Sequence, residues 1–166
     1  MARRLRERDD VPFRDPFLDS DAALVPVPRS GLLAEGALWP ALEIARELRA
    51  WDFGSQVLPC LERTMAVAKA ATSVAEARPK ARTHLESLIV VEPLSLPARV
   101  TLVDDVVTRG AQLFGAAWAI WSVRPDVEIR AFAAVRTVSD ASDFIALAEP
   151  CSGRIEWRDE ECRRRP

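Results

Sequence analysis

Two adjacent carboxylates follow a mainly apolar run in the segment RVTLVDDVVTRGAQLF, which spans residues 99–114. Asp104 and Asp105 come directly after the apolar residues, and a threonine, an arginine and a glycine come soon after them. In an open parallel sheet, ligands bind outside the carboxyl ends of the strands, where loops lead into the next helices. If the run is a buried strand, its two charges therefore lie where a ligand can satisfy them.

The residues that follow the aspartates suit an anion. Thr108 offers a hydroxyl group, Gly110 permits a tight turn, and a helix that starts here offers unpaired N–H groups with a partial positive charge. The carboxylates themselves suit hydroxyl groups or a metal ion. A ligand with a phosphate beside a polyol, such as a phosphorylated sugar, meets both requirements. The alternative without a ligand is a solvated turn, or an aspartate that caps the next helix.

The flanking sequence predicts the elements that would position this loop. Short apolar runs predict strands at residues 23–27, 55–62, 99–103 and 128–137. Apolar residues at helical spacing predict helices at 36–51 and 110–123. The alanine-rich residues 63–82 are expected to form a surface helix or a mobile loop. Strands that alternate with helices predict an α/β domain with a mainly parallel sheet flanked by helices.

These residues resemble a known family. The segment VTLVDDVVTRGAQ resembles the phosphoribosyl pyrophosphate (PRPP) signature of type I phosphoribosyltransferases. The resemblance implies a Rossmann-like fold with a small hood from the chain ends, and Asp104 and Asp105 as the catalytic pair that holds the ribose hydroxyls. It implies that five residues wrap the 5-phosphate: Thr108, Arg109, Gly110, Ala111 and Gln112. The family usually has threonine at the position of Arg109, and threonine or serine at that of Gln112.

A second segment supports the same resemblance. LVPVPRSG, residues 24–31, resembles the pyrophosphate loop of the family, in which Arg29, Ser30 and Gly31 would face the leaving group. A turn punctuated by proline is the alternative. Between the two loops the family has a mobile flap, and residues 63–82 stand in its place. The candidate flap cations are Arg63, Lys69, Lys80 and Arg82, each of which could instead belong to a solvated helix face.

The resemblance implies a phosphoribosyltransferase that moves the ribose 5-phosphate group of PRPP to a nitrogen acceptor, such as a nucleobase, and releases pyrophosphate. Mg²⁺ would be held through PRPP by Asp104 and Asp105. The hood would choose the base, and Asp140, Phe144 and Trp157 are candidates for contacting it. The family is commonly dimeric, so a homodimer is implied. The alternatives are a non-catalytic regulatory protein that binds PRPP or a nucleotide, and an accessory protein in DNA uptake or nucleic-acid metabolism, because the basic pattern is most similar to ComF-type domains.

The length of 166 residues predicts one domain. We expect residues 1–21 to form a flexible arm or part of the hood, 22–137 the phosphoribosyltransferase core, and 138–166 a C-terminal extension. In that extension DASDFIALAE predicts a helix and GRIEWRD an edge strand. The basic ends, MARRLRER and CRRRP, are expected to be disordered tails, with nucleic-acid contact as the alternative. Trp118 and Trp121 are expected in the core or at a subunit contact.

Composition limits the other function classes. The net charge of −2 gives the whole chain no electrostatic preference for nucleic acid. No apolar stretch approaches the ~20 residues that span a bilayer, and the N-terminus lacks the apolar segment of a signal peptide, so we expect a cytoplasmic protein. The three cysteines are widely spaced, and His84 is the single histidine. Free thiols are therefore expected in place of a zinc site or a disulfide framework.

Overall fold

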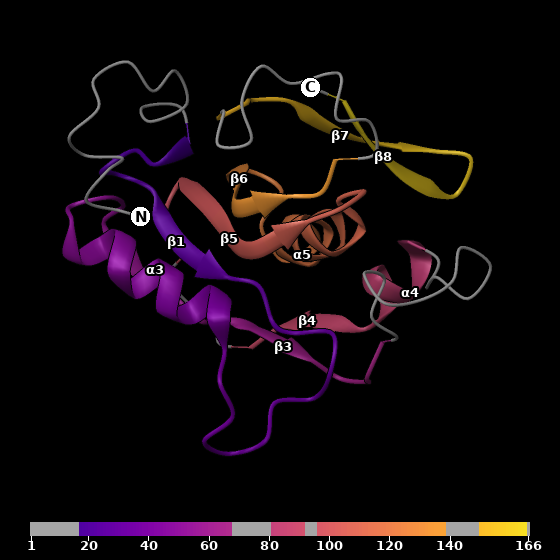
Figure 1. Cartoon of the computed structure of the whole chain (residues 1–166), viewed down its shortest axis with the longest axis horizontal. Coiled ribbons are helices and arrows are strands. Elements are labelled where there is room, and N and C mark those ends of the chain that lie inside the picture. The colour runs from indigo at the N-terminus through magenta and orange to yellow at the C-terminus, as the bar shows by residue number, and fades with distance from the viewer. Residues whose placement is uncertain (1–16, 68–80, 92–95, 139–149, 166) are drawn as a thin grey trace.

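A four-stranded parallel sheet forms the centre of the computed structural model, which describes residues 17–67, 81–91, 96–138 and 150–165 (Figure 1). Its strands run in the order β2-β1-β5-β6. They are β1 (Ala23–Pro26), β2 (Gln56–Val57), β5 (Arg99–Val107) and β6 (Glu128–Arg136). Every pairing in this sheet is parallel. The prediction of an α/β domain with a mainly parallel sheet is confirmed.

The two central strands are apolar on both faces. All of β1 is buried, and so is β5 from Val100 to Asp104. Successive side chains of a strand point to opposite faces, so the apolar residues of these strands divide between two cores. Val25, Val100 and Leu102 belong to one core, whereas Leu24 and Val103 belong to the other. A strand that is covered on both sides in this way has an unbroken apolar sequence.

One helix packs against each face of the sheet. α3 (Pro40–Ala50) contributes Ala45 and Leu48 to the core that contains Leu24, and Pro40 occupies its first turn, where no N–H donor is needed. α5 (Ala111–Val123) contributes Leu113 and Ile120 to the opposite core. Figure 1 shows α3 alongside β1, with α5 beyond β5. The sequence predicted both helices. The helix predicted at 36–51 begins four residues before α3 and ends one residue after it, and the helix predicted at 110–123 begins one residue before α5.

A short antiparallel ladder lies outside the main sheet. It joins β3 (Leu61–Arg63) to β4 (Leu88–Val90), and α4 (Ala81–Glu86) precedes β4. The single strand expected at 55–62 is therefore wrong: β2 and β3 are separate strands. Pro59, which has no N–H to donate to a ladder, lies between them. Of the region predicted as a flap, residues 68–80 lie outside the described residues, and Lys69 and Lys80 lie there too.

The C-terminal segment forms a β-hairpin. β7 (Arg154–Arg158) pairs with β8 (Glu161–Arg165) in an antiparallel ladder, and no strand of the main sheet joins it. A strand forms at GRIEWRD as predicted, but it is not an edge strand of the main sheet. The disordered tail predicted at CRRRP is wrong for residues 162–165. The reason is that Cys162 is buried and its strand has a partner along its whole length. The helix predicted at DASDFIALAE and the basic segment MARRLRER lie outside the described residues.

Two further positions differ from expectation. Trp118 and Trp121 are 47% and 49% exposed, so the prediction that they lie in the core is wrong. Their ring centroids are 5.2 Å apart and the ring planes are tilted by 36°. α5 buries a different face, which contains Leu113, Ala116 and Ile120. Leu18 is buried in the core beside α3, so packed chain extends N-terminal to residue 22. Among the described residues, no helix combines the length and the apolar character needed to cross a membrane.

Candidate functional site

The two loops singled out in the sequence meet at one edge of the sheet. β1 and β5 are parallel neighbours, with Pro26 opposite Val103, so the carboxyl ends of both strands lie together. The ladder continues one step further, because the Val27 N–H donates to the Val103 carbonyl oxygen at 2.9 Å. The turn at residues 29–31 and the aspartate pair therefore leave the sheet side by side. Segments that are far apart in the sequence form a single candidate site.

Asp104 lies inside β5 and not after it. The expected strand ended at Val103, but pairing with β6 continues to Val107. Asp104 is 3% exposed, and its Oδ1 accepts the N–H of Asp105 at 3.0 Å. Gln112 Nε2 donates to both carboxylate oxygens, at 3.4 Å to Oδ1 and 3.3 Å to Oδ2. Burial, followed by the neighbouring charge of Asp105, raises the pKa of Asp104 well above its ordinary value.

Asp105 is the more open of the two carboxylates. Its side chain is partly buried, and its Oδ1 accepts the N–H of Val106 at 2.8 Å. The aspartates therefore differ in kind, although the sequence presents them as an equivalent pair. Asp104 is buried and both of its carboxylate oxygens accept hydrogen bonds from the protein, whereas Asp105 is the more exposed carboxylate.

The loop from Thr108 to Gly110 leads into α5 as the sequence predicted. Gly110 has a left-handed φ of 88° and is the N-cap residue, and no side chain caps the helix. The first N–H groups of a helix have no partner within the helix, so Ala111 and Gln112 bring such donors to this point. Thr108 is partly buried beside them. The predicted 5-phosphate residues are thus gathered at one helix start.

The β7–β8 hairpin packs against residues at this helix start, a contact that the sequence did not reveal. Gly110 approaches Ile155 so closely that a Cβ on the glycine would lie 2.6 Å from Ile155 Cδ1. Trp157 stacks on Phe114 with ring centroids 5.4 Å apart, so the candidate for contacting a base is engaged within the protein. The other two candidates for contacting a base, Asp140 and Phe144, lie outside the described residues. In the sequence, the alternation of Ile155 and Trp157 with charged residues was the signal that one face of this strand would be covered.

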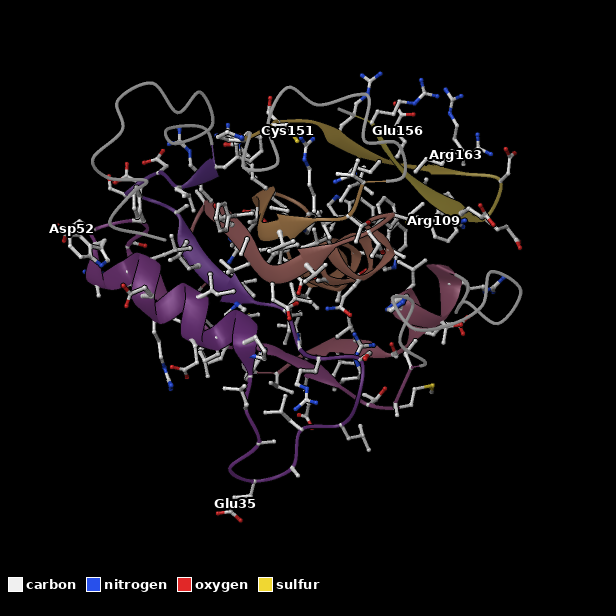
Figure 2. The ribbon with its side chains drawn as sticks, viewed as in Figure 1. Glu35, Asp52, Arg109, Cys151, Glu156 and Arg163 are labelled. Atoms are coloured by element: carbon white, nitrogen blue, oxygen red, sulfur yellow. The ribbon has the colours of Figure 1, made fainter. Side chains whose placement is uncertain are left out.

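Two predicted site cations lie on the surface. Arg109 is half exposed, and its Nη1 lies 3.6 Å from Glu161 Oε2, near the end of the hairpin where β7 turns into β8 (Figure 2). Arg82 lies on α4, where its Nε contacts Glu86 Oε1 at 2.8 Å. In this structure both guanidinium groups face carboxylates, and a phosphate would compete with those carboxylates for them.

The pyrophosphate turn is held by hydrogen bonds to two other segments. The Val67 N–H donates to the Ser30 carbonyl oxygen at 2.7 Å. Arg29 Nη1 donates to the Leu38 carbonyl oxygen at 3.0 Å. Gly31 has open space around its Cα, since a Cβ placed there would meet no atom of the described residues within 4 Å. The turn is therefore fixed in its backbone and open at its tip.

Arg63 is buried in β3, although the sequence suggested an exposed flap cation. It is 4% exposed, its Nε donates to the Arg29 carbonyl oxygen at 2.5 Å, and its Nη1 donates to Ser87 Oγ at 2.6 Å. Its Nη2 is buried and has no hydrogen-bond partner within the described part of the chain. Burial lowers the pKa of Arg63, and the charge of Asp104 opposes that shift. A buried guanidinium with a spare donor thus lies under the turn.

His84 is buried next to this arginine. Its Nδ1 has no hydrogen-bond partner among the described residues, and burial together with the Arg63 charge lowers the pKa of His84 to about 4. Gly115 of α5 allows the close approach, because a Cβ there would lie 2.8 Å from the His84 carbonyl oxygen. The histidine is therefore neutral at neutral pH and structural in its surroundings.

A shallow hollow lies at the opposite edge of the sheet. It is lined by residues at the amino ends of the strands, among them Asp19, Arg99 and Arg130. Arg99 Nη1 contacts Asp19 Oδ2 at 2.7 Å, so the charges there are already paired. Because these charges are paired with each other, we place the candidate site at the carboxyl edge of the sheet and not in this hollow.

In the part of the chain that the structure describes, no group of three or more His, Cys, Asp and Glu side chains is arranged to hold a metal ion. Comparison of the chain with protein-family models, curated proteins and solved structures gives no match. A functional assignment therefore rests on the two loops and on their geometry.

Proposed function

We propose that the chain is a type I phosphoribosyltransferase, which binds PRPP at the carboxyl edge of β1 and β5 and transfers its ribose 5-phosphate group to a nitrogen acceptor. One observation carries the proposal. The two segments that resemble the pyrophosphate loop and the PRPP signature come from distant parts of the sequence, and they emerge from adjacent parallel strands. A chance likeness in two separate loops gives no reason for them to meet.

Each part of PRPP has a chemically suitable neighbour at this edge. The start of α5, with uncapped N–H groups, suits the 5-phosphate. Asp105, the more open carboxylate, suits the ribose hydroxyls. The turn at 29–31 suits the pyrophosphate group, because its backbone is fixed and a buried cation lies under it. Asp104 then holds Gln112 and the start of α5 in place.

The reaction would be a displacement at the anomeric carbon of the ribose. The acceptor nitrogen forms a bond to this carbon, and the bond to pyrophosphate breaks with its electron pair leaving on the pyrophosphate oxygen. Mg²⁺, bound mainly by oxygens of PRPP and by one carboxylate of the chain, would supply charge neutralisation of the leaving group. Asp105 is the carboxylate available for that contact, because both oxygens of Asp104 are engaged.

A screen of nitrogen acceptors, followed by pyrophosphate release from PRPP and Mg²⁺, tests the proposal. We expect release with at least one acceptor, and loss of both release and PRPP binding in a double Asp104→Asn, Asp105→Asn variant. Glu43→Gln and Glu47→Gln together make a matched control on α3, where the same loss of two charges affects surface contacts only. PRPP binding that survives the double aspartate change would contradict the proposed site.

A non-catalytic protein that binds PRPP or a nucleotide is the second candidate. Two contacts favour it: Gln112 occupies Asp104, and Glu161 lies beside Arg109. Both departures from the family motif are thus engaged within the protein. Tight PRPP binding without turnover for any acceptor would select this candidate over the transferase.

A further inference from the structure

Arg63 connects three segments around the candidate site. It extends from β3 to the carbonyl of Arg29 in the pyrophosphate turn and to the hydroxyl of Ser87, which follows α4. We propose that Arg63 is a positioning residue that orients this turn for the pyrophosphate group, an inference that rests on the proposed PRPP site. It differs from the role of a mobile flap cation, because the guanidinium is buried and fixed at two nitrogens.

The orientation follows from the geometry of the peptide group. In a trans peptide the carbonyl oxygen and the N–H of the next residue point in opposite directions. The chain has no cis peptide among its described residues. Since the Arg29 carbonyl points to the buried Arg63, the N–H of Ser30 points away from it. Arg63 therefore directs a backbone donor out of the protein interior, where an anion can accept it.

Charge adds to this orientation. Burial of an arginine without full hydrogen bonding is costly, and Nη2 of Arg63 has no hydrogen-bond partner among the residues that the structure describes. Electrostatic attraction is also stronger in the protein interior than in water. An anion at the turn therefore gains from the buried charge and in turn offsets the cost of burying it. Arg63 also interacts electrostatically with Asp104, so ligands with a pyrophosphate group should depend on Arg63 more strongly than ligands without one.

Three ligands separate the two halves of the site. Isothermal titration would compare Mg²⁺ with PRPP, Mg²⁺ with inorganic pyrophosphate, and ribose 5-phosphate alone. For Arg63→Met we expect the Kd for PRPP and for pyrophosphate to rise about tenfold or more, since hydrogen bonds to charged groups are among the stronger ones. The Kd for ribose 5-phosphate should stay within about twofold, because its phosphate and hydroxyls use the other loop. Arg63→Lys keeps the charge and should restore part of the loss.

Arg49→Met is the matched control. Arg49 also donates its Nε to a backbone carbonyl, that of Ser55 at 3.0 Å, but it lies at the far end of α3. All three Kd values should be unchanged in this variant. Ser87→Ala removes the acceptor of Nη1 and also the hydrogen bond that Ser87 Oγ donates to the His84 carbonyl oxygen at 3.3 Å. It replaces Arg63→Met if the latter fails to fold, and should show a weaker loss with the same selectivity.

The outcomes are distinguishable. If the wild type binds all three ligands and Arg63→Met binds them equally well, or loses all three to the same degree while folded, the positioning role is wrong and the proposed PRPP site stands. If the wild-type protein binds none of the three, the proposed function fails, and this inference fails with it.

Discussion

Gln112 donates its side-chain amide to both carboxylate oxygens of Asp104, which ties the first turn of α5 to the buried part of β5. In the motif that this segment resembles, threonine or serine usually stands at this position, and its shorter side chain carries a single O–H donor. Gln112, which departs from that motif, therefore has a hydrogen-bonding partner within the protein. It makes Asp104 a residue that holds the loop and leaves Asp105 as the carboxylate nearer to solvent.

Asp104→Asn should stabilise the protein at neutral pH while it weakens PRPP binding. The raised pKa of Asp104 means that the folded state binds the proton more tightly than the unfolded state, so the ionised carboxylate lowers stability above its folded pKa. Each kcal/mol gained should raise the melting temperature by about 2–4 °C. Thermal unfolding at pH 7.5 and pH 4.5 checks this, and the gain should shrink at the lower pH. An equal change at both pH values would contradict it.

His84 should make the protein less stable as the pH falls from 6.5 towards 4. The lowered pKa, about 4, means that the unfolded state binds more protons in this window. The full loss is on the order of 3 kcal/mol, at 1.36 kcal/mol for each pKa unit. Denaturant unfolding of wild type and His84→Asn across this range measures it. Asp104, whose pKa is raised, changes the stability in the opposite direction as the pH falls through the same range. The effect of His84 is therefore the difference between wild type and the single His84→Asn variant. A slope that His84→Asn leaves unchanged would refute the assignment.

Gly110→Ala should destabilise the protein by about 1–3 kcal/mol. The backbone at this position has a left-handed φ, and the new Cβ would overlap Ile155 Cδ1. Ile155→Ala in the same chain should recover the steric part of the loss, and the part due to φ should remain. Denaturant unfolding of the two single variants and the double variant gives the coupling. Fully additive effects would show that the hairpin does not press on this loop.

Glu161→Gln should tighten ribose 5-phosphate binding by up to about fivefold at low salt, the range expected for an exposed ion pair. The change frees Arg109 from its carboxylate neighbour. The effect should fade at high ionic strength, because exposed charges are screened. Glu43→Gln, which removes an exposed ion pair on α3, is the control and should leave binding unchanged. Weaker binding in Glu161→Gln would mean that the carboxylate supports the loop and does not compete with the ligand.

Sequence patterns predicted the parts of the fold that depend on local order. The apolar run at 99–103 predicted a strand, and the helical spacing of apolar residues after Gly110 predicted a helix. The structure has both. Burial of charged residues was not predictable, because it depends on partners elsewhere in the chain. Arg63 finds its partners at Arg29 and Ser87, and no pattern within residues 63–82 points to either.

The C-terminal arginines illustrate the same limit. Three consecutive arginines suggest a disordered tail, but alternate residues of β8 point to opposite sides, and pairing with β7 decides their environment. Glu156 on β7 contacts Arg165 Nε at 3.2 Å and Arg154 Nε at 2.9 Å, so part of the charge is neutralised within the hairpin. The exposed tryptophans of α5 were misjudged for the related reason that helical spacing identifies a face and not what covers it.

The pairing of β1 with β5 has a consequence for folding. Ala23 lies opposite Val100, so this ladder closes a long loop, and non-local contacts of this kind form slowly compared with α3 or the β7–β8 hairpin. The candidate site exists only once that ladder is complete, since each strand carries one of its two loops. In refolding, the ability to bind ligand should therefore return with the slowest phase, and a fragment that ends before β5 holds one half of the site with nothing opposite it.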